Sequence, residues 1–283
     1  MQPQKMMDME GWVAFLGNAE IPVLKQTARD LAAIRQYPDK LSARGVADII
    51  VRDPMMAVKL LRYLQQHKHR SQVTEVVQIE QALLMMGVEA FFNKLPPQPL
   101  AEEVLRGHLD ALICLLHVTH RSQLASAYAF DWAVRLRDLH FEEVRIAALL
   151  HDLAELLMWH FAPADMLKIR AMQQRDKVLR SHIAQEQVLG FPLSALQSAL
   201  AREWNLPRLL LALMDSERAT EQRVQNVILA VDLARHSANG WDNAALPDDY
   251  KNIGGLLGMQ AEDVIVMIGA AEGNSRGLDK PHS

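Results

Sequence analysis

The sequence predicts an all-α fold, and three observations lead to this prediction. Apolar residues recur at spacings of three and four along the chain, which is the periodicity of a helix and not of a strand. Leu, Ala, Met and Gln are abundant, whereas clusters of β-branched residues are scarce. Residues that typically begin and end helices recur between the periodic segments. We therefore expect helices throughout.

The individual helices follow from these boundary residues. A helix typically begins after Ser, Asp, Asn or Thr, often with proline just inside, and ends where glycine adopts a left-handed conformation. Starts are expected at Ser42, Asp53-Pro54, Asn205 with Pro207, and Thr220, and stops at Gly87, Gly190, Gly240 and Gly258. The expected helices are 23–37, 42–51, 54–66, 75–86, 109–136, 142–160, 196–204, 208–215 and 221–236.

A proline-rich segment divides the chain. Three prolines lie between residues 94 and 99, where they should interrupt helix and bend the backbone. We therefore expect an N-terminal helical lobe over 1–98, a helical bundle over 99–240, and a C-terminal helix with a flexible tail over 241–283.

Composition excludes several classes of protein. Half of the 283 residues are hydrophobic, which is ample for a core, and the formal charge of −4 argues against general attraction to nucleic acid. The single cysteine, Cys114, rules out an intramolecular disulfide, and the first ten residues lack the basic and apolar regions of a secretory signal. The apolar stretches 206–214 and 261–271 are too short to span a bilayer. We expect a cytoplasmic protein without membrane segments.

The candidate chemistry centres on a His151-Asp152 doublet within the expected helix 142–160. It follows the small apolar run 147–150, which would let a neighbouring helix approach closely. Nitrogen and oxygen ligands together suit a divalent metal ion. The alternative is a buried histidine that is hydrogen-bonded to its neighbour, with the aspartate capping a helix or solvated.

Two residues on other expected helices could complete a metal site. His120 shares a helix face with apolar residues at 113, 116, 124 and 127, and Asp232 follows an apolar pair. His120 could instead be an ordinary core histidine, and Asp232 could pair locally with Arg235 or His236. The candidate metal ligands are His120, His151, Asp152 and Asp232. The sequence implies no cofactor beyond one divalent ion, and no catalytic residue is assigned.

In this order the four residues resemble the HD superfamily of metal-dependent phosphohydrolases. The segments 21–24, 49–55, 59–62 and 79–87 further resemble, in residue type and spacing, the HDOD domain, the HD-related output domain of bacterial signalling proteins. The similarity continues through 147–157, 186–190 and 204–207, and covers about residues 15–235. It implies an HD-like helical bundle joined to an N-terminal helical lobe. It also implies a regulatory role through a protein partner of a bacterial signalling pathway or a small nucleotide ligand, without an established catalytic activity.

Departures from the enzymatic relatives weigh against catalysis. Cyclic-dinucleotide phosphodiesterases of the HD-GYP type carry lysine three positions after the aspartate of the doublet, and this chain has Glu155, which would repel a phosphodiester. Asp215-Ser216 replaces the histidine pair that HDOD relatives often carry after the Trp-x-x-Pro segment. The position of the first ligand fits either His120 or Arg121. We therefore favour a non-catalytic regulatory module over a single-metal phosphohydrolase acting on a nucleotide, with a ligand-free helical scaffold as the third hypothesis.

Overall fold

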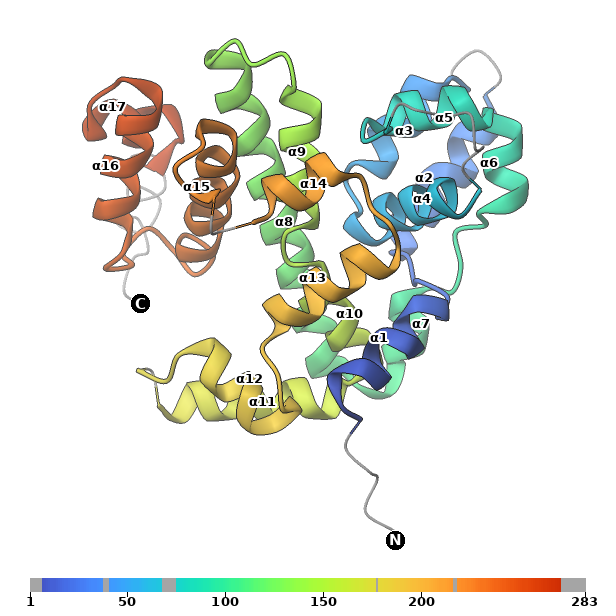
Figure 1. The fold of residues 1–283 in the computed structure, drawn as a ribbon, viewed down its shortest axis with the longest axis horizontal. Coiled ribbons are helices and arrows are strands. Elements are labelled where there is room, and N and C mark those ends of the chain that lie inside the picture. Colours follow the sequence, from blue (N-terminus) through green and yellow to red (C-terminus); the bar gives the residue numbers. More distant parts are fainter. Residues whose placement is uncertain (1–6, 38–40, 68–74, 177, 216–217, 271–283) are drawn as a thin grey trace, which may run out of the picture. The chain divides into compact units, whose positions relative to one another are not determined.

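The computed structural model describes residues 7–37, 41–67, 75–176, 178–215 and 218–270 (Figure 1). Within these ranges every regular element is helical, apart from an isolated parallel bridge between Val23 and Leu100. The predicted all-α class is therefore confirmed. No helix of the described residues has both the length and the apolar character needed to cross a membrane.

The chain forms two compact units. Unit 1 comprises residues 1–120 and 152–211, and unit 2 comprises residues 121–151 and 212–283. This grouping differs from the boundaries at residues 98 and 240, which stay a prediction about domain organisation. The proline segment does interrupt helix, since it lies between α6 (Val88–Lys94) and α7 (Ala101–Val104) and contains a cis peptide bond between Gln98 and Pro99.

Unit 1 holds most of the helices. Besides α6 and α7 it contains α1 (Met9–Asn18), α2 (Lys25–Arg35), α3 (Ala43–Ile50), α4 (Pro54–Gln66), α5 (Ile79–Met86), the 3-10 turn Leu105–Gly107, and the first part of α8 (Leu109–Arg135). It also contains α10 (Leu153–Phe161), α11 (Pro163–Arg175), α12 (Ser181–Leu189), α13 (Leu193–Glu203) and most of α14 (Arg208–Leu213).

The centre of unit 1 is α4. Asp53 caps its first turn by accepting hydrogen bonds from the backbone N–H groups of Met55 and Met56 at 2.9 and 3.2 Å, and Pro54 occupies the first helical position. All residues from 54 to 62 are buried, because α4 packs against α3, α5 and α10. A helix buried on all sides has little room for polar side chains, so its two buried cations, Lys59 and Arg62, stand out.

Unit 2 is smaller and is organised around α15 (Gln222–His236). This helix packs against α9 (Phe141–Leu150) and α16 (Leu246–Leu257), and α17 (Ala261–Met267) packs on α16. Buried Asn226 on α15 donates a hydrogen bond from Nδ2 to the backbone oxygen of Ala129 on α8 at 3.1 Å.

The expected helix boundaries are confirmed in part. Helix α4 spans the expected residues, and all four predicted glycine stops have positive φ, between 69° and 127°. The expectation of a single helix over 142–160 is wrong, because α9 ends at Leu150 and α10 begins at Leu153. Asp152 has φ −100° and ψ 24°, outside the helical range, although neither glycine nor proline marks the break. The expected helix 75–86 begins only at Ile79.

Candidate functional site

The His151-Asp152 doublet forms the turn between α9 and α10. Both side chains are half-buried, and Asp152 occupies the N-cap position of α10 without accepting a capping hydrogen bond through its side chain. In unit 1 the first turn of α10 is instead capped from α13, where Gln197 Oε1 accepts from the backbone N–H of Ala154 at 2.7 Å. Asp152 therefore occupies the N-cap position of α10, and Gln197 of the neighbouring helix α13 supplies the capping hydrogen bond.

His120 lies on the exposed side of α8. Ile113 and Leu116, which share its face, are 48% and 39% exposed, whereas Ala111, Leu115 and other residues of the opposite stripe are buried. The alternative that His120 is a core histidine is therefore wrong. The physical reason is that α8 carries two apolar stripes, and helical periodicity alone cannot tell which one faces the core.

Asp232 is half-buried on α15 of unit 2. Its Oδ1 lies 3.5 Å from Nη1 of Arg235, so the local pairing expected at the third position does form. His236, the other expected partner, instead places Nδ1 2.6 Å from Oδ2 of Asp249 on α16. Burial raises the pKa of Asp249, and the hydrogen bond and charge of His236 act in the opposite direction. Asp232 thus belongs to a cluster of charges where α15 meets α16.

The four predicted metal ligands are divided between the two units. His120 and Asp152 belong to unit 1, and His151 and Asp232 belong to unit 2. Among the described residues, no three His, Cys, Asp or Glu side chains gather in a way that could hold a metal ion. The quartet therefore stays a prediction, and no chemical step is derived through a metal.

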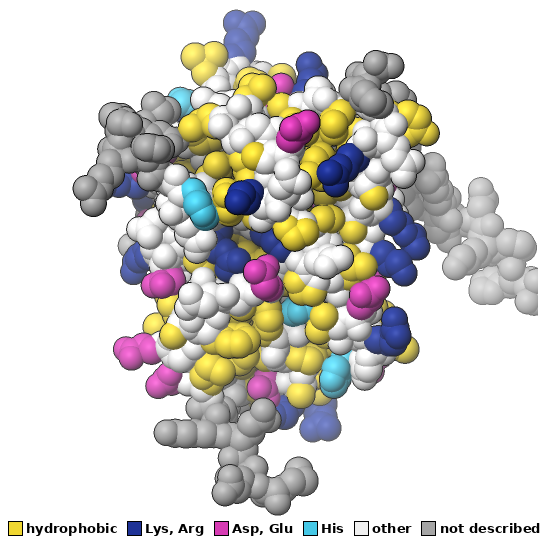
Figure 2. Space-filling model, turned by 90° about the vertical axis from the view of Figure 1, so that its right-hand side faces the viewer, with side chains coloured by type: hydrophobic (Ala, Val, Ile, Leu, Met, Phe, Trp, Pro, Cys, Tyr) yellow, Lys and Arg dark blue, Asp and Glu magenta, His cyan; other side chains and the backbone are white. Residues whose placement is uncertain are grey.

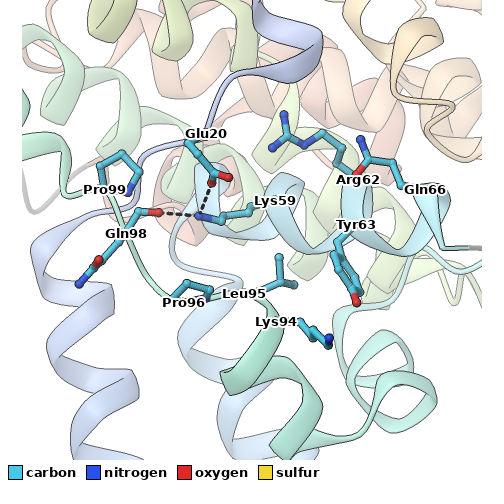
Figure 3. Close-up of a pocket in the computed structure, with 10 residues that line it drawn as sticks. All are labelled: Glu20, Lys59, Arg62, Tyr63, Gln66, Lys94, Leu95, Pro96, Gln98 and Pro99. Atoms are coloured by element: carbon cyan, nitrogen blue, oxygen red, sulfur yellow. Dashed lines mark hydrogen bonds and ion pairs between the residues drawn. The ribbon is translucent and has the colours of Figure 1, made fainter.

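A second site lies in unit 1, where α4 faces the proline segment. It is a pocket of about 650 Å³, called here the α4 pocket (Figure 3). Its lining residues are Glu20, Lys59, Arg62, Tyr63, Gln66, Lys94, Leu95, Pro96, Gln98 and Pro99. Cavities of this size hold cofactors and other small ligands in many proteins. From the sequence, residues 59–62 were recognised only as part of a family pattern, and this pocket was not predicted.

Lys59 is the most constrained cation of the α4 pocket. Its side chain is only 4% exposed, and its ammonium group lies 2.5 Å from the backbone oxygen of Gln98, 3.3 Å from Oε2 of Glu20 and 3.4 Å from the backbone oxygen of Ile21. Figure 3 shows Lys59 reaching between Glu20 and Gln98. Three acceptors match the three protons of an ammonium group. Burial lowers the pKa of Lys59, and the charge of Glu20 partly restores it.

Arg62 lies one helical turn further along α4. Its Nη1 donates to the backbone oxygen of Ala19 at 2.9 Å, and its guanidinium carbon lies 5.5 Å from the ring centroid of Trp204. Within the described part of the chain, Nε and Nη2 make no further hydrogen bond. Burial lowers the pKa of Arg62, against the opposing charge of Glu20, but an arginine stays charged at neutral pH. The guanidinium is therefore fixed in place and keeps donors for a ligand.

The remaining lining combines a third cation with flat apolar groups. Lys94 is exposed at the last turn of α6, next to the pocket residues Leu95 and Pro96. The Tyr63 ring stacks on His67, with centroids 3.9 Å apart and planes 21° apart, which holds the ring in one orientation. The pocket thus offers both charge and an apolar wall.

The charge of the α4 pocket is local. Three cations and one carboxylate line it, so its formal charge is +2, whereas the whole chain carries −4. On the face drawn in Figure 2, basic side chains are scattered among acidic and apolar ones and form no broad basic patch. The lining residues Lys59, Arg62, Tyr63 and Gln66 follow the spacing of one helix face. Two cations within the otherwise apolar stretch 54–62 were the sequence feature that could have located the pocket.

Comparisons with known proteins identify the family and the fold of the chain. Residues 21–219 match the family model described as the HDOD domain. The fold is similar to that of a virulence factor from Campylobacter jejuni subsp. jejuni, with 16% identity, a TM-score of 0.69, and coverage of 99% of this chain and 100% of that one. It is also similar to the MmoQ response regulator from Methylococcus capsulatus strain Bath, with 17% identity, a TM-score of 0.63, and coverage of 88% and 98%. At these identities the structural likeness establishes the fold alone. A search of curated proteins found no significant match.

Proposed function

Because the chain belongs to the HDOD family, as its residues predicted, we propose that it is a non-catalytic regulatory module of bacterial signal transduction. In this proposal the module acts by binding a small ligand in the α4 pocket, and a protein partner of the signalling pathway responds to the bound state. One solved structure of similar fold is named as a response regulator, and the proposal extends a signalling role to this chain.

The observation that carries the proposal is the chemistry of the α4 pocket. Its polar lining consists of three cations, two amides, a phenol and a carboxylate, and that carboxylate already contacts Lys59. Fixed cations beside an apolar wall are suited to holding an anion, since charged hydrogen bonds orient it and the wall excludes water. The lining contains no Ser, Thr, Cys or His, and the amine of Lys59 is already held by Glu20 and two backbone carbonyl oxygens. Binding is therefore the activity that this geometry supports best.

The surroundings of the doublet support the same proposal. Glu155 lies on α10, one turn after Asp152, and its Oε1 is 3.4 Å from Nε1 of Trp159. A carboxylate at this position would oppose a phosphodiester that approached the doublet, because like charges repel. Glu155, which replaces the lysine of the HD-GYP phosphodiesterases, thus lies on the helix that begins directly after the doublet.

A hydrolysis assay tests the proposal. Protein purified without chelator would be incubated with Mg²⁺ or Mn²⁺ and a panel of nucleotides and cyclic dinucleotides, and phosphate release or ring opening would be measured. We expect the parent chain, His151→Ala and Asp152→Ala to give the same background rate. Turnover by the parent that both variants lose would contradict the proposal and favour the single-metal phosphohydrolase.

A further inference from the structure

Building on the proposed binding function, we infer that the α4 pocket takes a nucleoside phosphate. We further infer that a ligand phosphate replaces the Glu20 carboxylate at Lys59.

The charges of the pocket select an anion. Lys59, Arg62 and Lys94 line the pocket together with one carboxylate, Glu20, so the formal charge is +2 before a ligand enters and +3 once Glu20 has left. A nucleoside diphosphate carries two to three negative charges at neutral pH. Arg62 supplies planar donors for phosphate oxygens, and Lys59 supplies a compact cation held by two backbone carbonyls. The number and kind of cations therefore match one or two phosphate groups.

Glu20 has the properties of an exchangeable partner. Its side chain is 74% exposed, and its contact with Lys59 is 3.3 Å, longer than the 2.5 Å bond from Lys59 to Gln98. Exposed carboxylates form weak ion pairs, because water solvates the carboxylate nearly as well. A phosphate with greater charge can take its place, while the carbonyl oxygens of Ile21 and Gln98 continue to hold the ammonium group. Glu20 thus neutralises Lys59 when the pocket is empty.

The apolar part of the pocket suits a ring. Tyr63 is held flat by His67, and Leu95, Pro96 and Pro99 provide further apolar surface. A nucleobase stacks on such aromatic and apolar surfaces, and stacking on an aromatic side chain contributes about 1–3 kcal/mol for each base. A volume of about 650 Å³ lies within the range of pockets that bind ligands of this size. Inorganic phosphate alone would leave the ring side of the pocket unused.

The replacement of Glu20 by a ligand phosphate at Lys59 could signal to a partner that the α4 pocket is occupied. Glu20 lies in the connection between α1 and α2, one residue after Ala19, whose backbone oxygen accepts from Arg62. A ligand that binds Lys59 and Arg62 therefore acts on the contacts of α4 with Glu20 and Ala19 in this connection, while Lys59 keeps its bond to Ile21. The bound and empty states differ in the attachment of the α1–α2 connection, which a protein partner can detect.

The test uses two exposed residues that should act in opposite directions. Adenosine and guanosine diphosphates would be titrated calorimetrically into the full chain and into Glu20→Gln and Lys94→Gln, with Arg44→Gln as an exposed control outside the pocket. We expect Glu20→Gln to bind about fivefold more tightly and Lys94→Gln about fivefold more weakly, the size expected for one exposed charge. Arg44→Gln should bind like the parent, since the charge change lies elsewhere.

Two further sets of titrations separate the contribution of the nucleobase from that of the phosphate groups. We expect the unphosphorylated nucleosides and inorganic phosphate each to bind at least tenfold more weakly than the diphosphate, because each fills only part of the pocket. Tyr63→Leu should weaken binding of the diphosphate and leave binding of inorganic phosphate unchanged. Equal effects of Tyr63→Leu on both ligands would contradict the assignment of the ring to Tyr63.

The outcomes distinguish this inference from the proposed function. Binding of a diphosphate with the same affinity for parent, Glu20→Gln and Lys94→Gln would overturn the inference and leave a non-catalytic binding module in place. Absence of diphosphate binding at roughly 1 mM would also overturn it. Hydrolysis of the diphosphate that depends on His151 and Asp152 would instead contradict the proposed function.

Discussion

Two aspartates occupy the same structural position in two helices of unit 1, and their surroundings differ. Asp53 precedes α4 and is fully buried, and it accepts hydrogen bonds from the backbone N–H groups of Leu24, Met55 and Met56 at 2.9, 2.9 and 3.2 Å. Asp152 precedes α10 and is half-buried, and its side chain makes no capping bond. Asp53 thus secures a helix start, and Asp152 does not.

The difference between the two aspartates shows that two sequence patterns, the doublet at 151–152 and the helix start at Asp53, carry different information. The doublet at 151–152 belongs to the pattern that resembles the HD superfamily, yet the capping of α10 comes from Gln197. The start of α4 looked like an ordinary helix boundary, yet it fixes the helix whose cations line the α4 pocket. The residues that identify a family and the residues that line a cavity can therefore lie in different parts of the fold.

The largest effect is expected from removing the two aspartates in turn. Asp53→Ala would leave three buried backbone N–H groups unpaired and remove a hydrogen bond with Thr27, so we expect a loss of about 3 kcal/mol in the free energy of unfolding. Asp152→Ala should cost about 1 kcal/mol or less, because no helix cap is lost. Urea unfolding of both variants measures the difference. Equal losses would contradict the contrast between the two helix starts.

A second test concerns the interior of α10. His160 is buried and its Nδ1 has no hydrogen-bond partner among the described residues, and burial lowers its pKa from 6.5 to about 4. The unfolded chain therefore takes up this proton at higher pH than the folded chain. The stability due to neutral His160 is complete above pH 6.5 and is lost as the pH falls towards 4, by up to about 3 kcal/mol.

The variant His160→Phe isolates this effect. It keeps an aromatic ring against Phe161, whose ring centroid lies 4.6 Å away, and it cannot titrate. We expect its stability to fall less than that of the parent between pH 6.5 and pH 4, whereas the exposed His117→Gln should behave like the parent. Parallel pH profiles for His160→Phe and the parent would show that α10 does not hold a neutral histidine in its core.

A third test compares two lysines of the α4 pocket. Lys59→Met keeps an unbranched apolar side chain but leaves the carbonyl oxygens of Ile21 and Gln98 without their shared donor, so we expect a loss of about 2 kcal/mol in stability. Lys94→Met, at an exposed position, should stay within about 0.5 kcal/mol of the parent. Thermal unfolding of both variants measures this. Similar losses would mean that Lys59 is not a structural cation.

The smallest effect on stability is expected for Glu20→Gln. The carboxylate is 74% exposed, so its ion pair with Lys59 should contribute less than about 0.5 kcal/mol. Chemical denaturation in low and high salt tests this, and the small difference between variant and parent should become smaller still in high salt, which screens the ion pair. A loss above 1 kcal/mol would make Glu20 a structural partner of Lys59 and not an exchangeable one.

The sequence predicted much of the fold for clear physical reasons. Ser42, Asp53-Pro54 and the glycine stops mark helix ends through local backbone chemistry, so they could be identified without tertiary contacts. The break at Asp152 could not, because no local residue requires it. The exposed face of α8 could not be chosen either, since the helix is apolar on two sides.

The candidate site was harder to predict than the fold. The α4 pocket joins Glu20 and Lys59 with residues 94–99, which lie far apart in the sequence, and backbone carbonyl oxygens supply two of the three contacts of Lys59. The types and spacing of residues do not show which backbone carbonyl oxygens will lie near a given side chain in the fold. The predicted quartet could be proposed because it consists of side chains that chemistry readily recognises.

We propose above all that the chain binds a ligand in the α4 pocket and does not transform it. Equilibrium dialysis of the full chain against a labelled nucleoside diphosphate with Mg²⁺, followed by chromatography of the recovered ligand, tests both parts at once. We predict saturable binding, weakened in Lys94→Gln, with the diphosphate recovered intact. Recovery of hydrolysed ligand, or binding that Lys94→Gln leaves unchanged, would contradict the account.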